Sequence, residues 1–133
     1  MNKLKFYSSF MVVVAGILML SGCASNPSVG GMTYSYTSTI PPRDKNLIHN
    51  VTVSSVAGGE ETNPLWKSRI DNANFETALI DSLKSAKLYQ QLAKSNYLLQ
   101  ATLIRQDQPT FGLDLKVTTT VNYTLTNKRT KKT

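Results

Sequence analysis

The longest regular pattern in the chain is Leu113-Asp114-Leu115-Lys116-Val117-Thr118-Thr119-Thr120-Val121-Asn122-Tyr123-Thr124-Leu125-Thr126. Every second side chain, starting at Leu113, is apolar apart from one threonine, and those between are polar or charged. Side chains of a strand point alternately to its two faces, so this pattern predicts one long strand with a buried face and a wet face. Such a strand is typical of an antiparallel sheet covered on one side.

Three further elements precede this strand. Residues 51–56 are β-branched and alternate over their first half, and residues 97–104 alternate throughout, so each segment predicts a strand. Between them, apolar residues at three- and four-residue spacing predict a helix from about Asn72 or Asn74 to about Lys87, with Asn74 as its N-cap. The core-facing stripe of this helix is expected to contain Phe75, Leu79, Ser82, Leu83 and Ala86.

The order strand, helix, strand, strand predicts an α+β fold. We expect a two-layer sandwich, in which a small antiparallel or mixed sheet (β-α-β-β) carries one helix packed on one face. Short connections make the last two strands a hairpin and the helix a crossover. This small α+β domain is predicted to cover residues 51–133.

The chain begins like a secretory signal. Lys3 and Lys5 are followed by an apolar run of about 15 residues that ends at Leu20, short of the roughly 20 residues that a membrane-spanning helix needs. A charged start, a short apolar middle and small residues at the end are typical of a removed signal peptide, here residues 1–22.

Leu20, Ser21 and Gly22 stand directly before Cys23, the only cysteine of the chain. This resembles the lipobox of bacterial lipoproteins. The resemblance implies cleavage before Cys23, a diacylglyceryl thioether on its sulfur and a palmitoyl-type acyl chain on the new amino terminus. An uncleaved anchor and a buried free cysteine are the alternatives. Two or more acyl chains anchor a protein stably, so the expected partner of Cys23 is a lipid bilayer. With Ala24 after the cysteine, the resemblance favours the outer membrane, with the domain facing the periplasm; the inner membrane and a Gram-positive surface are the alternatives.

Residues 23–50 are small, polar and rich in proline and glycine, and they are predicted to form the lipidated N-terminus and a flexible tether. Within this stretch, residues 32–36 (Met32-Thr33-Tyr34-Ser35-Tyr36) alternate and are expected to pair as an edge strand.

Residues 56–68 and 74–83, with 97–103 and 117–125, resemble a group of small bacterial envelope lipoproteins of unknown role. The resemblance implies a one-domain lipoprotein and carries no catalytic residues. Such proteins continue past the Tyr123 strand, so this chain is expected to be shortened at its C-terminal end. Lys131 stands where a turn glycine is expected. The alternative to a shortened chain is that the long strand ends as an unprotected edge. We expect an incompletely covered apolar face and marginal stability.

The net charge is +7, but its distribution argues against nucleic acid as a partner. Two lysines leave with the signal, and four cations lie in the last six residues: Lys128, Arg129, Lys131 and Lys132. Without these six cations the net charge is about +1, which is too little positive charge to indicate a surface that binds DNA or RNA. The basic end is interpreted as a solvated turn or tail.

No motif for catalysis, a metal or a cofactor is present in the sequence. His49 has no partner pattern around it and is interpreted as a tether or loop histidine, and Glu60 and Glu61 are adjacent and so tend to point apart. A convergent carboxylate pair stays open as an alternative, because sequence does not show which distant residues meet.

The best predicted partner surface is the turn that holds Gly58, Gly59 and Trp66. Glycine pairs permit special backbone angles, and tryptophan is favoured as an interface anchor. The alternative is that Trp66 and Leu65 cap the end of the sheet. We therefore expect a non-enzymatic lipoprotein with a binding or accessory role toward an envelope protein or glycan. The alternative is an envelope hydrolase whose site converges only in the fold.

Overall fold

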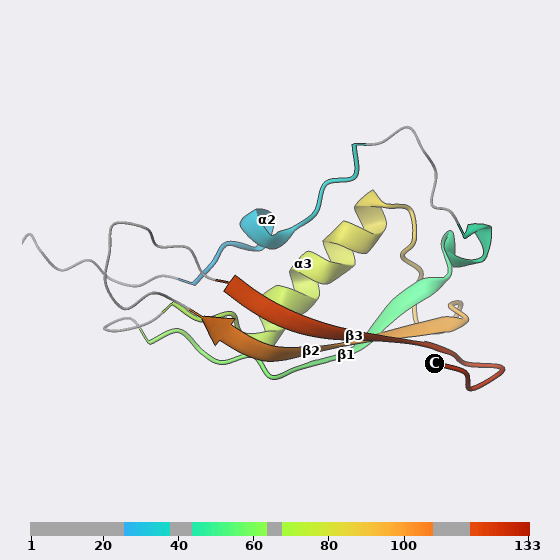
Figure 1. Cartoon of the computed structure of the whole chain (residues 1–133). Coiled ribbons are helices and arrows are strands. Elements are labelled where there is room, and N and C mark those ends of the chain that lie inside the picture. The colour runs from blue at the N-terminus through green and yellow to red at the C-terminus, as the bar shows by residue number, and fades with distance from the viewer. Residues whose placement is uncertain (1–25, 38–43, 64–67, 108–117) are drawn as a thin grey trace, which may run out of the picture.

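The computed structural model describes residues 26–37, 44–63, 68–107 and 118–133. Within these ranges the elements are α2 (Val29–Met32), the 3-10 helix η1 (Lys45–Leu47), β1 (Val51–Ala57), α3 (Asn72–Ser85), β2 (Tyr97–Asp107) and β3 (Thr118–Asn127) (Figure 1). A small sheet and one main helix make this an α+β fold, which confirms the predicted fold class.

The sheet has the order β1-β2-β3 and is mixed. β1 runs parallel to β2, with α3 as the crossover between them, and β2 runs antiparallel to β3. Leu103, Ala101 and Leu99 lie opposite Val121, Tyr123 and Leu125, so these three side chains of β3 share one face of the sheet, as predicted, although Tyr123 on that face is exposed. Residues 113–117 of that prediction lie outside the described residues.

Two bulges change which side chains face the helix. In β1 the register shifts between Val53 and Ser55, so that Val56 comes opposite the buried Ala101. In β2 the register shifts between Leu103 and Arg105, and Ile104 is 65% exposed. An inserted residue reverses the alternation of every side chain beyond it, so strict period two fails past these points.

Helix α3 begins one turn earlier than its predicted cap suggested. Asp71, in an extended conformation, is the N-cap, and its side chain accepts a hydrogen bond from the Asn74 backbone N–H at 2.8 Å. The prediction of Asn74 as N-cap is therefore wrong, because Asn74 lies within the first turn and supplies the donor. Ala78, at 2% exposure, is the most buried residue of α3, and among the strands the helix packs chiefly against β1.

The segment before residue 38 runs along α3 (Figure 1). Ser28 caps α2, and then the backbone N–H groups of Tyr34 and Tyr36 donate to Ser82 Oγ at 2.8 Å and Ser85 Oγ at 2.7 Å. The edge strand predicted for residues 32–36 is wrong, because these donors bond to helix side chains rather than to a neighbouring strand. Ser82 thus contacts this segment, although it was expected in the core stripe.

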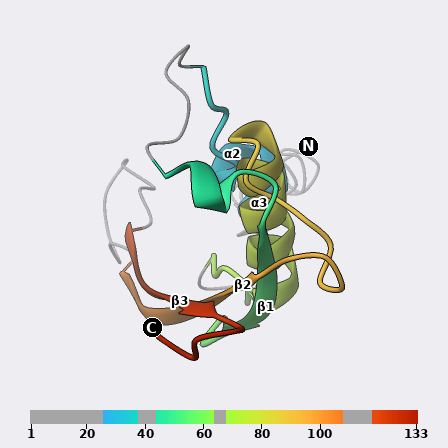
Figure 2. The same cartoon turned by 90° about the vertical axis from the view of Figure 1, so that its right-hand side faces the viewer.

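The helix covers the sheet unevenly. Figure 2 shows α3 above β1, which forms one edge of the sheet, whereas β3 forms the opposite edge. Tyr123, on the inner face of β3, is 53% exposed, which agrees with the predicted incomplete cover of the apolar face. Partial burial of its ring raises the pKa of the Tyr123 hydroxyl above 10.0, because the charged form loses water.

Three residues other than glycine have a left-handed backbone in the described part: His49 (φ 49°), Lys87 (φ 58°) and Lys131 (φ 57°). Lys87 ends α3 in a Schellman arrangement, with Leu88 N–H bonded to Leu83 O at 2.8 Å and Lys87 N–H to Lys84 O at 3.0 Å. Lys131 lies in the turn that Asn127 N–H closes onto Lys132 O at 3.0 Å. The expectation that the turn position of Lys131 suits glycine is confirmed by its positive φ.

Candidate functional site

The predicted partner surface begins where β1 ends, at Gly58 and Gly59. Gly58 has φ 79°, and a β-carbon there would overlap the Leu103 carbonyl oxygen. A β-carbon on Gly59 would lie 2.6 Å from the Asn72 backbone nitrogen. Both glycines are therefore required by close backbone approach, as the sequence predicted.

The glycine turn is bound to the start of α3. Gly59 N–H donates to Asn72 Oδ1 at 2.8 Å. The next residue, Glu60, donates its backbone N–H to Ile70 O at 3.0 Å. These two bonds hold the chain beyond β1 alongside the residues that lead into the helix.

Gln106 is a further support that the sequence did not reveal. Its Oε1 accepts from Ile70 N–H at 2.8 Å, and its Nε2 donates to Ile70 O at 3.1 Å. Strict alternation assigns Gln106 to the wet face of β2 with Gln100, Thr102 and Ile104. The bulge between Leu103 and Arg105 places it opposite Thr119 and on the inner face instead. A bulge has no reliable sequence signal here, so this residue could not be predicted.

A polar hollow of about 520 Å³ opens at this end of the domain. We call it the α3 hollow; its lining residues are Asn26, Gly59, Glu61, Thr62, Asp71, Asn72 and Ala73. Of the predicted partner surface it contains Gly59, whereas Trp66 and Leu65 lie outside the described residues. The participation of Trp66 stays a prediction.

Hydrogen bonds hold the lining of the α3 hollow, and one ion pair lies beside it in the sequence. Arg69 Nη1 lies 3.2 Å from Glu60 Oε2. Thr62 Oγ1 accepts from Arg69 N–H at 2.8 Å and donates to Arg69 O at 2.9 Å. Asp71 Oδ2 accepts from Asn74 Nδ2 at 2.6 Å and lies 3.5 Å from Asn26 Nδ2. The wall thus offers carboxylate, amide and hydroxyl groups to a polar partner.

Two carboxylates, Glu61 and Asp71, line the same hollow from different segments. Asp71 caps α3 through Oδ1, which accepts from the Asn74 backbone N–H, and its Oδ2 accepts from the Asn74 side-chain amide. His49 lies in the loop before β1, at the other end of the sheet, where its backbone N–H donates to Lys87 O at 2.9 Å. In the ranges that the structure describes, no three histidine, cysteine, aspartate or glutamate side chains gather as a metal site would require.

The predicted lipidation site, Leu20 to Cys23, lies outside the described residues. Among the helices that are described, none has the length and apolar character to cross a bilayer.

Comparison with known proteins gives no match: no family model, no curated protein and no solved structure corresponds to this chain. The resemblance to small envelope lipoproteins therefore stays a prediction.

Proposed function

We propose that this protein is a lipoprotein of the bacterial envelope, anchored in the outer membrane through acylated Cys23, with a non-enzymatic binding role toward an envelope protein or glycan. The observation that carries the proposal is the sequence Leu20-Ser21-Gly22-Cys23 after a charged and then apolar start. The sulfur of a cysteine is the nucleophile that such acylation needs.

An acylated Cys23 would be joined to the described domain by only a short segment. Asn26 lines the α3 hollow, and from Ser28 to Tyr36 the chain is capped or bonded to α3. Three peptide units separate Cys23 from Asn26, which is a reach of at most about 11 Å at ~3.8 Å per residue. An acylated Cys23 would therefore keep the α3 hollow near the bilayer surface.

The wall of the α3 hollow supports binding rather than catalysis. Its polar groups are held by backbone contacts, and Gly58 and Gly59 fix the turn beside it. A rigid polar surface loses little conformational entropy when it binds a partner.

The alternative function, an envelope hydrolase, has one observation in its favour, which is that Glu61 and Asp71 share the hollow. Acid–base chemistry at Asp71 would disturb a hydrogen bond to Asn74, either the α3 cap at Oδ1 or the side-chain bond at Oδ2. Glu61→Gln separates the two functions. A hydrolase would lose release of soluble fragments from purified envelopes, whereas a binding protein would release none with either form.

The anchor is tested by labelling cells with an alkyne analogue of palmitate. We expect label on the wild-type protein, none on Cys23→Ser, and loss of membrane partitioning in that variant. A Cys23→Ser protein that still partitions with membranes would show that the proposed anchor is wrong.

The partner is tested by crosslinking and pull-down from envelopes that contain the intact protein. We expect at least one crosslinked species that Trp66→Ala removes and Tyr34→Ala, at an exposed ring outside the hollow lining, retains. If both variants give the wild-type pattern, the turn that bears Trp66 is not the partner surface.

A further inference from the structure

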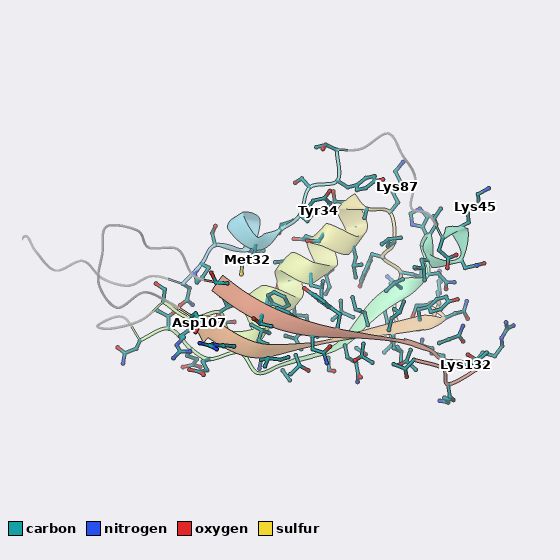
Figure 3. The ribbon with its side chains drawn as sticks, viewed as in Figure 1. Met32, Tyr34, Lys45, Lys87, Asp107 and Lys132 are labelled. Carbon is teal, nitrogen blue, oxygen red and sulfur yellow. The ribbon has the colours of Figure 1, made fainter. Side chains whose placement is uncertain are left out.

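The end of the domain opposite the α3 hollow is strongly basic. β1 and β2 begin there, and α3 and β3 end there, so turns that are distant in sequence meet. Figure 3 shows Lys45, Lys87 and Lys132 at this end and Asp107 at the other. We call it the basic pole; its seven cations are Lys45, Lys87, Lys94, Lys128, Arg129, Lys131 and Lys132.

In the part of the chain that the structure describes, no cation of the basic pole forms a salt bridge with a carboxylate, and Lys128 Nζ donates to Leu92 O and Ser95 Oγ instead. Within the described residues the salt bridges are Arg69–Glu60, Lys84–Asp81 and Arg105–Asp107, and none involves the pole. Asp44, the carboxylate nearest in sequence to Lys45, caps η1 by accepting from Asn46 N–H at 2.8 Å. Clustered like charges repel one another, so this pole does not gain stability from its charge and favours an external anion.

Asparagine side chains form the centre of the basic pole. Asn50 Oδ1 accepts from Asn96 N–H at 2.8 Å and from Asn96 Nδ2 at 3.0 Å, and Asn50 Nδ2 donates to Asn46 O at 2.8 Å. Asn127 Oδ1 accepts from the backbone N–H groups of Arg129 and Thr130. These bonds join the starts of β1 and β2 and fix the turn after β3.

The same residues surround a second, smaller hollow of about 190 Å³, lined by Asn46, Asn50, Asn96, Tyr97, Asn127 and Arg129. This volume corresponds to about six water molecules at ~30 Å³ each, which suits one small polar ring rather than a chain of stacked bases. Tyr97 is the only aromatic residue in the lining, so the hollow lacks the series of stacking surfaces that single-stranded nucleic acid uses.

The asparagine hollow offers amides, a phenol ring and a guanidinium, and lysines surround it. Together these groups suit a ligand that carries both hydroxyls and an acidic group. Amide groups donate to and accept from hydroxyls, and a guanidinium binds a carboxylate or phosphate through two parallel hydrogen bonds. We propose that the basic pole binds an anionic glycan, with one acidic sugar in the asparagine hollow, its anionic group on Arg129 and neighbouring negative charges along the lysines.

This site gives the proposed binding role a ligand class and rests on that role, but not on acylation. At roughly 3.3 Å per residue, the seven-residue β1 spans about 20 Å between the basic pole, where it begins, and the glycine turn at the α3 hollow, where it ends. A protein anchored at Cys23 through the short segment that precedes Asn26 can therefore present the basic pole away from the bilayer surface.

The test uses the full protein in a nonionic detergent, with polygalacturonate as the carboxylated probe and dextran as the neutral one. At constant ionic strength we expect binding to polygalacturonate and none to dextran. Arg129→Gln should weaken binding about tenfold, because a charge-assisted contact is lost. Arg105→Gln removes the same group from an exposed site at the opposite end and should change affinity less than twofold.

Three outcomes would overturn the site. Equal weakening by Arg105→Gln and Arg129→Gln would mean general charge attraction. Full affinity in Arg129→Lys would mean that no two-bond contact is made. Tighter binding of a DNA duplex than of polygalacturonate at equal charge would assign the pole to nucleic acid. Cys23→Ser tests the anchor separately, so failure of one proposal does not decide the other.

Discussion

The two ends of the domain meet the same backbone requirement with different residues. At the α3 hollow the left-handed position is Gly58, and the space beside it is filled by the Leu103 carbonyl. At the basic pole the left-handed positions are His49, Lys87 and Lys131. A side chain in this conformation costs about 1–2 kcal/mol relative to glycine. At the packed end only glycine fits the left-handed position. At the solvent-exposed end there is room for a side chain, and Lys87 and Lys131 occupy left-handed positions although glycine would cost less there.

The two ends also differ in whether their cationic side chains form ion pairs. At the α3 hollow Arg69 lies 3.2 Å from Glu60, and nearby Arg105 lies 2.7 Å from Asp107, so each guanidinium has a carboxylate. No cation of the basic pole forms such a pair in the described part of the chain. At the first end both described arginines are paired with carboxylates, whereas the cations of the basic pole are left to attract an external anion.

The largest expected effect is at the packed end. Gly58→Ala forces a β-carbon into the Leu103 carbonyl and a side chain into a left-handed backbone. We expect a loss of about 2–4 kcal/mol in the free energy of unfolding, measured by urea denaturation.

Gly30→Ala is the matched control, because nothing lies within 4 Å of the added β-carbon. It should change stability by less than about 1 kcal/mol. Equal losses in both variants would mean that the close approach of the Leu103 carbonyl at Gly58 is not what makes the alanine costly.

The strands and the glycine turn could be predicted because each has a local signal. Alternation at Val121, Tyr123 and Leu125 and the pair Gly58-Gly59 are readable without tertiary contacts. The cap of α3 was misplaced by three residues because Asp71 and Asn74 are both good N-caps, and only the hydrogen bond to Asn74 N–H distinguishes them.

The next effect concerns that cap, which also lines the α3 hollow. Asp71→Ala removes acceptors for the N–H and Nδ2 of Asn74. We expect a loss of about 1–2 kcal/mol in urea denaturation. Asp71→Asn keeps a capping oxygen and should recover most of this lost stability. Full recovery would mean that the negative charge of Asp71 adds nothing through the helix dipole.

The basic pole could not be predicted, although all of its cations are visible in the sequence. Lys45, Lys87 and Lys94 are separated by other elements from the C-terminal turn, and only the parallel β1–β2 pairing with antiparallel β3 brings them to one end. A net charge summed along the chain hides a cluster that the topology creates.

A smaller effect, of opposite sign, is expected at the basic pole. Lys87→Gly places glycine at φ 58° in the C-terminal cap of α3 and should stabilise the protein by about 1 kcal/mol. Lys87→Gln removes the charge but keeps the β-carbon, so the difference between the two variants measures the backbone cost. If Gly and Gln variants are equally stable, the left-handed lysine carries no cost and the contrast with Gly58 disappears.

The smallest effect lies between the two ends, at Tyr123 on the uncovered part of β3. Burial raises the pKa of its hydroxyl above 10.0 in the folded protein, so folding favours the protonated form. The resulting stability is fully present below pH 10 and is lost as the pH rises through the folded pKa. Tyr123→Phe should abolish this part of the alkaline loss of stability. The measurement is the free energy of unfolding of wild type minus that of the variant at each pH. The titration of the lysines is common to both proteins and cancels in this difference. Tyr34→Phe, at a ring that is 62% exposed, controls for the removal of a tyrosine hydroxyl. The same alkaline slope in wild type and Tyr123→Phe would mean that the Tyr123 hydroxyl keeps its water on folding, so that the gap in the helix cover extends across the middle of β3.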